Sequence, residues 1–355
     1  MSFPFLQPYA GLSNSLQTAQ AAGGPGGAVG GWVELARTTL GSSGSSIDVT
    51  SLPDKRYYMV LTDVQSSGIT NIRMRNNGDS GNNYASRWCD NGGTDSTIGS
   101  FNNMVCHNQN VTVPQFMVSY GSNRSSSEKL WIHKIGIQNT AGAGNAPLRG
   151  ESVSKHAQTT NPIDQITIFE GESGSFDTNS ECVVLAYDPD DNHTSNFWEE
   201  LASTTTSSAG DTLQSGTISA KKYLWIQATY KNDGASDINA LPRFNADAGS
   251  NYTTRYSING AGDTTRTSRT WVDIESGSQR QKFCNMFIIN NASTEKLCIF
   301  HQMDYGSSGA ASAPNRWEGV AKWTNTSNQI TSIEWDQRDS GDYAAGAELR
   351  VWGAD

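Results

Sequence analysis

The chain has 355 residues, a formal net charge of -10 and a pI near 5.0. This acidity argues against a nucleic-acid partner, because Lys and Arg supply most of the affinity for a phosphate backbone. No apolar run approaches the roughly 20 residues of a membrane helix, and the opening MSFPFLQPYAGL lacks the basic and apolar regions of a secretory signal, so we also expect no membrane partner.

Residues 1–31 lie outside the repeat described below. Residues 12–22 are compatible with a short helix, and AAGGPGGAVGG at 21–31 predicts a flexible tether, because Gly at this density does not hold a regular element. Two interpretations stay open. The segment is either a disordered lead-in or an arm that docks on a partner. The apolar residues of such an arm include Phe3, Phe5, Leu6 and Tyr9.

The remainder of the chain is a tandem duplication. WVELARTTL at 32–40 returns as WEELASTTT at 198–206, and APLRGESVSK at 146–155 returns as APNRWEGVAK at 313–322. Matches of this kind lie at offsets of 166 to 168 residues. A unit of this length is far longer than a solenoid repeat and can close its own core. We therefore predict a first domain at 32–187 (unit 1), a linker at 188–196 and a second domain at 197–355 (unit 2).

Short segments of alternating or β-branched residues fill both units, and each ends in Gly, Ser, Asn or Asp. RYYMVLTDV at 56–64, KLWIHKIGIQ at 129–138 and ECVVLAY at 181–187 are examples. Helical periodicity is absent. This pattern is typical of antiparallel sandwiches. We predict an all-β fold with two homologous sandwiches, each of eight strands and jelly-roll type.

The clearest repeated motif is GxNYxxR. It places Tyr84 and Arg87 in unit 1 where unit 2 has Tyr252 and Arg255. Gly and Asn suit a tight turn, and a Tyr can close a sandwich corner by hydrogen bonding a backbone carbonyl. The alternative is that Tyr and Arg line a loop that binds a sugar or a partner.

Matching loops also carry Arg149 in unit 1 and Arg316 in unit 2. An arginine copied in this way can bind a carboxylate of a neighbouring subunit through two parallel hydrogen bonds. The alternative is a local surface ion pair that contributes little.

We expect no cofactor, no metal site and no enzymatic activity. Asp188, Asp190, Asn192 and Glu199 imitate part of a calcium loop, but His193 stands where that loop needs Gly. The histidines are scattered and lack metal-ligand spacing, and no nucleophile elbow or phosphate loop is present. Five cysteines without a CxxC pair, none matched between the units, predict free thiols.

With both units laid out, the chain resembles a group of structural proteins from marine tailed phages. The resemblance is carried by PFLQPYAGLSNSLQTAQAA, GWVELARTTLGS, LPDKRYYM, GxNYxxR, NTAGAGNAP and the second start NFWEELAS. It covers nearly the whole chain and implies a component of the virion, assembled in the host cytoplasm. Unit 2 has YGSSGAASAP at 305–314 in place of the NTAGAGNAP loop.

The resemblance implies a virion protein that decorates the head or forms a fibre-like appendage, held to other capsid or tail proteins by its N-terminal arm. A homo-oligomer is expected, and three chains would supply six similar lobes. A different class stays open, namely an adhesin that binds a host-surface glycan through aromatic loops. A third possibility, a polysaccharide depolymerase, predicts release of reducing ends.

Overall fold

The computed structural model describes residues 31–355, apart from residues 125, 192–195, 235–236, 275–279 and 306–308. Every helix or strand assigned in this part is a β-strand, and no helix long and apolar enough to cross a membrane occurs in it. Several predictions fall outside the described residues. They concern the helix at 12–22, Asn192, His193 and the arm residues Phe3, Phe5, Leu6 and Tyr9.

Unit 1 contains a large and a small antiparallel sheet. In spatial order the large sheet consists of β1 (Val33–Thr39), β12 (Glu181–Tyr187), β3 (Tyr57–Val64), β8 (Gln115–Ser122), β9 (Lys129–Ile137), β10 (Leu148–His156), β5 (Tyr84–Asp90) and β6 (Ser96–Phe101). The small sheet consists of β2 (Ser46–Thr50), β11 (Gln165–Glu170), β4 (Ile72–Asn76) and β7 (Met104–Val105).

Unit 2 repeats this plan. Its large sheet consists of β13 (Glu199–Thr205), β23 (Glu348–Ala354), β15 (Tyr223–Tyr230), β19 (Lys282–Ile289), β20 (Lys296–Asp304), β21 (Asn315–Trp323), β17 (Tyr252–Ile258) and β18 (Thr264–Arg269). Its small sheet consists of β14 (Gln214–Thr217), β22 (Ser332–Glu334) and β16 (Arg243–Phe244). The two units therefore share one strand order, apart from β7, and each is a β-sandwich.

The strands outnumber the eight that we predicted for each sandwich, because the large sheet alone has eight. The polar strands account for the difference. β6 is exposed along most of its length, and β10 faces its own core with Gly150, Ser152, Ser154 and His156. Strands of this kind carry little of the apolar alternation from which a strand is predicted.

Each unit buries its own core between its two sheets. In unit 1 that core includes Tyr58, Val60 and Trp131 from the large sheet and Ile47 and Ile166 from the small sheet. The matching core of unit 2 is built in the same way. Each unit can thus bury an apolar core of its own, which is what a sandwich of two sheets requires.

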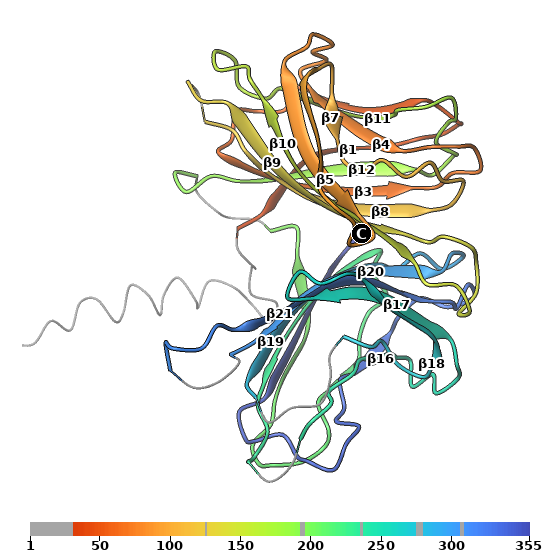
Figure 1. The fold of residues 1–355 in the computed structure, drawn as a ribbon, viewed down its shortest axis with the longest axis vertical. Coiled ribbons are helices and arrows are strands. Elements are labelled where there is room, and N and C mark those ends of the chain that lie inside the picture. The colour runs from red at the N-terminus through yellow and green to blue at the C-terminus, as the bar shows by residue number, and fades with distance from the viewer. Residues whose placement is uncertain (1–30, 125, 192–195, 235–236, 275–279, 306–308) are drawn as a thin grey trace, which may run out of the picture.

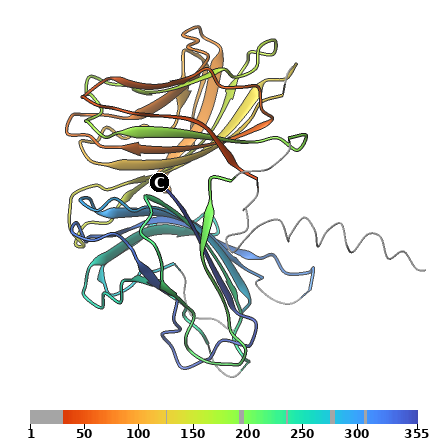
Figure 2. The same ribbon diagram turned by 180° about the vertical axis from the view of Figure 1, so that it is seen from behind.

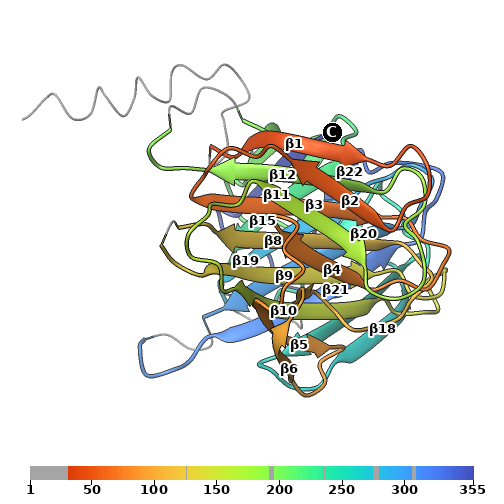
Figure 3. The same cartoon turned by 90° about the horizontal axis from the view of Figure 1, so that it is seen from above.

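The two units stack on each other, so that four sheets lie in layers (Figures 1 and 2). We call the face of each large sheet that points away from its own small sheet the outer face. A third apolar cluster joins the two outer faces and draws residues from both units. Seen along the stack, the strands of unit 1 lie over those of unit 2 (Figure 3).

Burial on two faces explains the composition of the central strands. β3 alternates between Tyr58 and Val60, which point into the core of unit 1, and Met59 and Leu61, which point into the third cluster. All four are buried. A strand covered on both sides reads as a continuous apolar run, and YYMVL at 57–61 is such a run. We expected two self-sufficient lobes. Each unit does have a core of its own, but the two units also pack on each other as layers of one stack.

Candidate functional site

The two units meet at an interface whose centre is the third apolar cluster. Unit 1 contributes six buried apolar side chains to it, from β3, β8 and β12: Met59, Leu61, Phe116, Val118, Val183 and Leu185. Unit 2 contributes Trp198, Tyr223, Phe287, Ile289, Leu297, Ile299, Val320, Trp352 and Ala354. Aromatic side chains supply much of this contact, as they do at stable interfaces.

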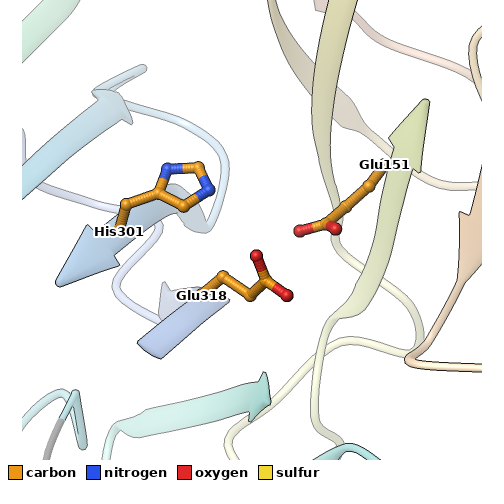
Figure 4. A group of neighbouring side chains, drawn as sticks. All are labelled: Glu151, His301 and Glu318. Atoms are coloured by element: carbon orange, nitrogen blue, oxygen red, sulfur yellow. The ribbon is translucent and has the colours of Figure 1, made fainter. Parts of the chain in front are cut away.

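A polar cluster lies beside the apolar contact. Glu151 of unit 1 faces His301 and Glu318 of unit 2, and the ligand atoms of the three side chains lie within 4.8 Å of one another (Figure 4). Lys134 Nζ lies 2.8 Å from Glu151 Oε1, and Arg149 Nη1 donates to the same oxygen at 2.6 Å. Arg149 Nη1 also lies 3.7 Å from Glu318 Oε1.

The cationic groups decide the chemistry of this cluster. Burial raises the pKa of Glu151, but the charges of Lys134 and Arg149 outweigh burial and hold that pKa below its ordinary value. Burial, assisted by Lys134, lowers the pKa of His301 to about 4, so this imidazole is neutral at pH 7. Because Lys134 and Arg149 already compensate the carboxylates, we assign no metal to the cluster.

Arg149 joins the two units through a carboxylate. Its Nη2 donates to Asp263 Oδ1 at 2.6 Å, and its Nε donates to Asp263 Oδ2 at 3.4 Å. Both side chains are almost fully buried. The predicted two-bond contact is therefore present, but its carboxylate belongs to unit 2 of the same chain and not to a neighbouring subunit. Arg255 lies on the same interface, where its Nε donates to the carbonyl of Pro147 at 2.8 Å.

A hairpin loop of unit 1 covers a buried ion pair of unit 2. Lys322 Nζ lies 2.9 Å from Glu295 Oε2, and both side chains are excluded from solvent. Lys322 also donates to the carbonyls of Gln138 and Thr140 at 3.1 and 2.7 Å, while the Gly142 amide donates to Glu295 Oε1 at 2.6 Å. The loop between β9 and β10 thereby satisfies both charges.

A second ionic contact lies near the other edge of the interface. Lys222 Nζ of unit 2 lies 3.0 Å from Glu181 Oε1 and 3.3 Å from Asp63 Oδ2 of unit 1. The hydroxyl of Tyr223 donates to the same oxygen of Glu181 at 2.8 Å. Sequence analysis did not single out any of these residues, because their charges meet only when the outer faces pack together.

The repeated tyrosines form structural corners. The Tyr84 hydroxyl lies 3.2 Å from the carbonyl of Asn76 and 3.1 Å from that of Asp79, and the Tyr252 hydroxyl lies 3.2 Å from the carbonyl of Phe244. Both rings are buried. Neither tyrosine can line a ligand-binding loop, because each is enclosed at the start of a strand. The corner interpretation of GxNYxxR therefore holds for the tyrosines.

Two of the predicted arginines remain accessible. Arg87 lies 3.3 Å from Asp95, and Arg316 lies 3.3 Å from Glu318, with more than half of each arginine side chain exposed. They are the repeat counterparts of Arg255 and Arg149, which unit packing encloses. The prediction treated all four arginines alike because they are copied in the sequence. In the structure Arg87 and Arg316 are exposed, whereas Arg149 and Arg255 are largely buried.

The remaining polar features are dispersed. His107, His133 and His156 are buried at separate places in unit 1, and burial lowers the pKa of His107 and of His133 to about 3. In the connector, Asp190 and Asp191 bind Arg56 and Lys55. All five cysteines are free thiols.

Comparison with known proteins gives no relative from which a function could be transferred. No family model and no curated protein matches the chain. Domains LG4-5 of the mouse laminin alpha1 chain match with 11% identity and a TM-score of 0.19, covering 93% of this chain and 91% of that one. Neisserial surface protein A matches with 7% identity and a TM-score of 0.11, covering 79% and 96%. At TM-scores this low, the matches carry no argument.

Proposed function

We propose that this chain is a structural protein of a phage particle, either a head decoration or a fibre-like appendage, which attaches through its N-terminal residues. The proposal is supported by the motifs shared with marine phage proteins. It is also supported by one observation from the structure. Both large sheets carry apolar side chains on outer faces that the unit contact covers only in part. Apolar groups gathered on a solvent-facing sheet are typical of assembly surfaces.

The stacked architecture suits a structural role. The third apolar cluster, the Arg149–Asp263 contact and the Glu295–Lys322 pair hold the two units in one arrangement. An interface this apolar, with its charges paired, favours a rigid body over two mobile domains. A rigid four-layer body suits a particle surface.

The adhesin alternative loses three of the residues on which it was built, although Arg87 stays accessible. Tyr84 and Tyr252 are enclosed, and Arg255 is bonded across the unit interface. We therefore do not carry this alternative further.

Electron microscopy of virions labelled with an antibody against this chain tests the proposal. We expect label at regular positions on the head or tail, and label that disappears when the protein lacks residues 1–30. Absence of label on intact particles, with the protein detected in the infected-cell lysate, would overturn the virion assignment. Normal incorporation of the truncated protein would overturn attachment through the N-terminal residues.

A further inference from the structure

Each outer face has exposed apolar side chains on one part, and that part differs between the two units. In unit 1, Leu130, Ile132 and Val153 are exposed, whereas their repeat counterparts Leu297, Ile299 and Val320 are buried against unit 1. In unit 2, Phe283, Met303 and Tyr305 are exposed, whereas their counterparts Phe116, Gly136 and Gln138 are buried against unit 2. Tyr57 is exposed, and its counterpart Tyr223 is buried. The described part of the chain thus has eight exposed large apolar side chains, and seven of them have a repeat counterpart in the other unit that is buried.

Each outer face therefore has two halves, which we name by their neighbours. The loop half lies next to the loop after β9 or β20, and it holds Phe116, Gly136 and Gln138 in unit 1 and Phe283, Met303 and Tyr305 in unit 2. The pair half lies next to the ion pair Glu128–Lys155 or Glu295–Lys322, and it holds Leu130, Ile132 and Val153 in unit 1 and Leu297, Ile299 and Val320 in unit 2. Within the chain, the loop half of unit 1 packs on the pair half of unit 2. A two-fold contact would use the same residues on both partners. Most of this contact uses different ones, although Glu151 faces its own counterpart Glu318, and Leu185 and its counterpart Trp352 both lie in the third cluster. The contact is therefore largely heterologous, and one half of each unit stays uncovered by the described residues.

The unused halves retain the polar groups of the contact. Glu128 and Lys155 form an exposed pair at 2.9 Å, in the positions where unit 2 has the buried pair Glu295–Lys322. The loop half of unit 2 offers Gly309, whose φ of 89° matches the 91° of Gly142, the residue that donates to Glu295. An exposed ion pair at the positions of Glu295 and Lys322, and a glycine with the backbone angle of Gly142, are therefore both present on the unused halves.

The charges on the unused halves are also complementary. Arg149 binds Asp263 within the chain, and their counterparts Arg316 and Asp95 are both exposed. Similarly, Lys222 binds Glu181, and the counterparts of these two residues are Arg56 and Glu348. In each case one charge lies on unit 1 and the opposite charge on unit 2, as an intermolecular contact requires.

We propose that the loop half of unit 2 packs on the pair half of unit 1 of a second copy of this chain, in the manner in which unit 1 packs on unit 2. Head-to-tail contacts of this kind give a ring if the rotation closes and a filament if it does not. The proposal deepens the proposed function by naming the partner of the assembly surface. It rests on the exposure pattern, so it can be tested without particles.

The contact between copies is weaker than the contact within the chain. Unit 2 carries Gln227, Asn285 and Arg350 at the positions where unit 1 buries Leu61, Val118 and Val183. A more polar surface of the same shape gains less from desolvation. Association is therefore reversible and increases with protein concentration, unlike the packing of the two units.

Two substitutions at exposed positions test the two halves separately. Ile132→Lys places a charge in the pair half of unit 1, and Phe283→Lys places one in the loop half of unit 2. Each lowers self-association by roughly 100-fold or more, because the introduced ammonium must be desolvated in the contact. Sedimentation velocity of the full-length wild type shows oligomers that grow with concentration, and each variant alone sediments as a monomer.

The decisive measurement is an equal mixture of the two variants. The intact loop half of the Ile132→Lys chain still fits the intact pair half of the Phe283→Lys chain, so the mixture forms one-to-one dimers and nothing larger. Ile69→Lys alters the eighth exposed apolar residue, which lies outside both halves, and it leaves assembly unchanged. Thermal unfolding verifies that all three variants fold.

Three results would overturn the proposal. They are a wild type that stays monomeric, a mixture that fails to dimerise, and assembly that persists in both variants but is lost when residues 1–30 are deleted. The last result would assign the surface to the N-terminal residues. None of them removes the virion assignment, which depends on the antibody label, and missing label leaves the solution measurement intact.

Discussion

Leu130 and Leu297 occupy the same position in the two copies of the repeat, yet Leu130 is 55% exposed and Leu297 is 1% exposed. The local environments are otherwise alike, since both residues follow a buried Lys at the start of a strand, β9 or β20. The difference arises because unit 1 covers the pair half of unit 2, whereas no described residue of the chain covers the pair half of unit 1. The duplication thus provides internal controls, because one residue type can be tested in a covered and an uncovered setting.

The ion pairs give the first test. We expect Glu295→Gln to lower the free energy of unfolding by about 3 kcal/mol, because it leaves the buried ammonium of Lys322 without its counter-charge. The matched change Glu128→Gln removes an exposed partner of Lys155 and should cost less than about 1 kcal/mol. Chemical denaturation of both variants measures the difference. Equal losses would contradict the assigned burial of the Glu295–Lys322 pair.

A second comparison concerns the copied arginines. Arg149→Met leaves Asp263 buried, with Arg255 at 3.9 Å as its remaining ion-pair partner among the described residues, and we expect a loss of about 2 to 4 kcal/mol. Arg316→Met removes an exposed side chain and should change the unfolding free energy by no more than about 0.5 kcal/mol. Urea midpoints at one protein concentration suffice to compare them. If Arg149→Met were as mild as Arg316→Met, the two-bond contact would not hold the units together.

The sequence was sufficient to predict the all-β class and the duplication, because both are local or periodic properties. Tyr84 and Tyr252 could be recognised as corner residues, since their Gly and Asn neighbours specify a tight turn. The stacking of the units could not be predicted. The alternation in β9 looks the same whether Leu130 and Ile132 face solvent, as they do, or face a partner, as Leu297 and Ile299 do in β20.

Charged residues were the least predictable part of the site. Lys322 and Glu295 look like ordinary surface residues in the sequence, and their burial depends on a loop that is more than 150 residues away. Arg149 was singled out because it is copied, but nothing in the copy showed whether its carboxylate would come from this chain or from another. Only the packing of the outer faces decides between these two.

The tyrosine corners give a third prediction. Tyr84→Phe removes a hydroxyl that bonds two backbone carbonyls, and we expect a loss of about 1 to 2 kcal/mol. Tyr252→Phe should cost a similar amount. Tyr57→Phe is the control, because the Tyr57 ring is exposed and its change should fall within about 0.5 kcal/mol. Differential scanning calorimetry measures all three, and an unchanged melting temperature for Tyr84→Phe would argue against the corner role.

The last prediction concerns acid and a buried histidine. Burial lowers the pKa of His133 to about 3, whereas an unfolded histidine titrates near about 6.5. The folded state therefore binds fewer protons between these values, so stability rises with pH across that window and is lost on acidification, at up to about 1.4 kcal/mol per pH unit for one histidine.

His133→Gln can still bond the Ser119 hydroxyl, 2.8 Å away in the wild type, and removes the titration. We expect the variant to lose stability less steeply than the wild type below about pH 6.5 and in parallel with it above. Unfolding free energies measured by denaturant at successive pH values decide this, and parallel curves throughout would show that His133 is not a buried neutral imidazole.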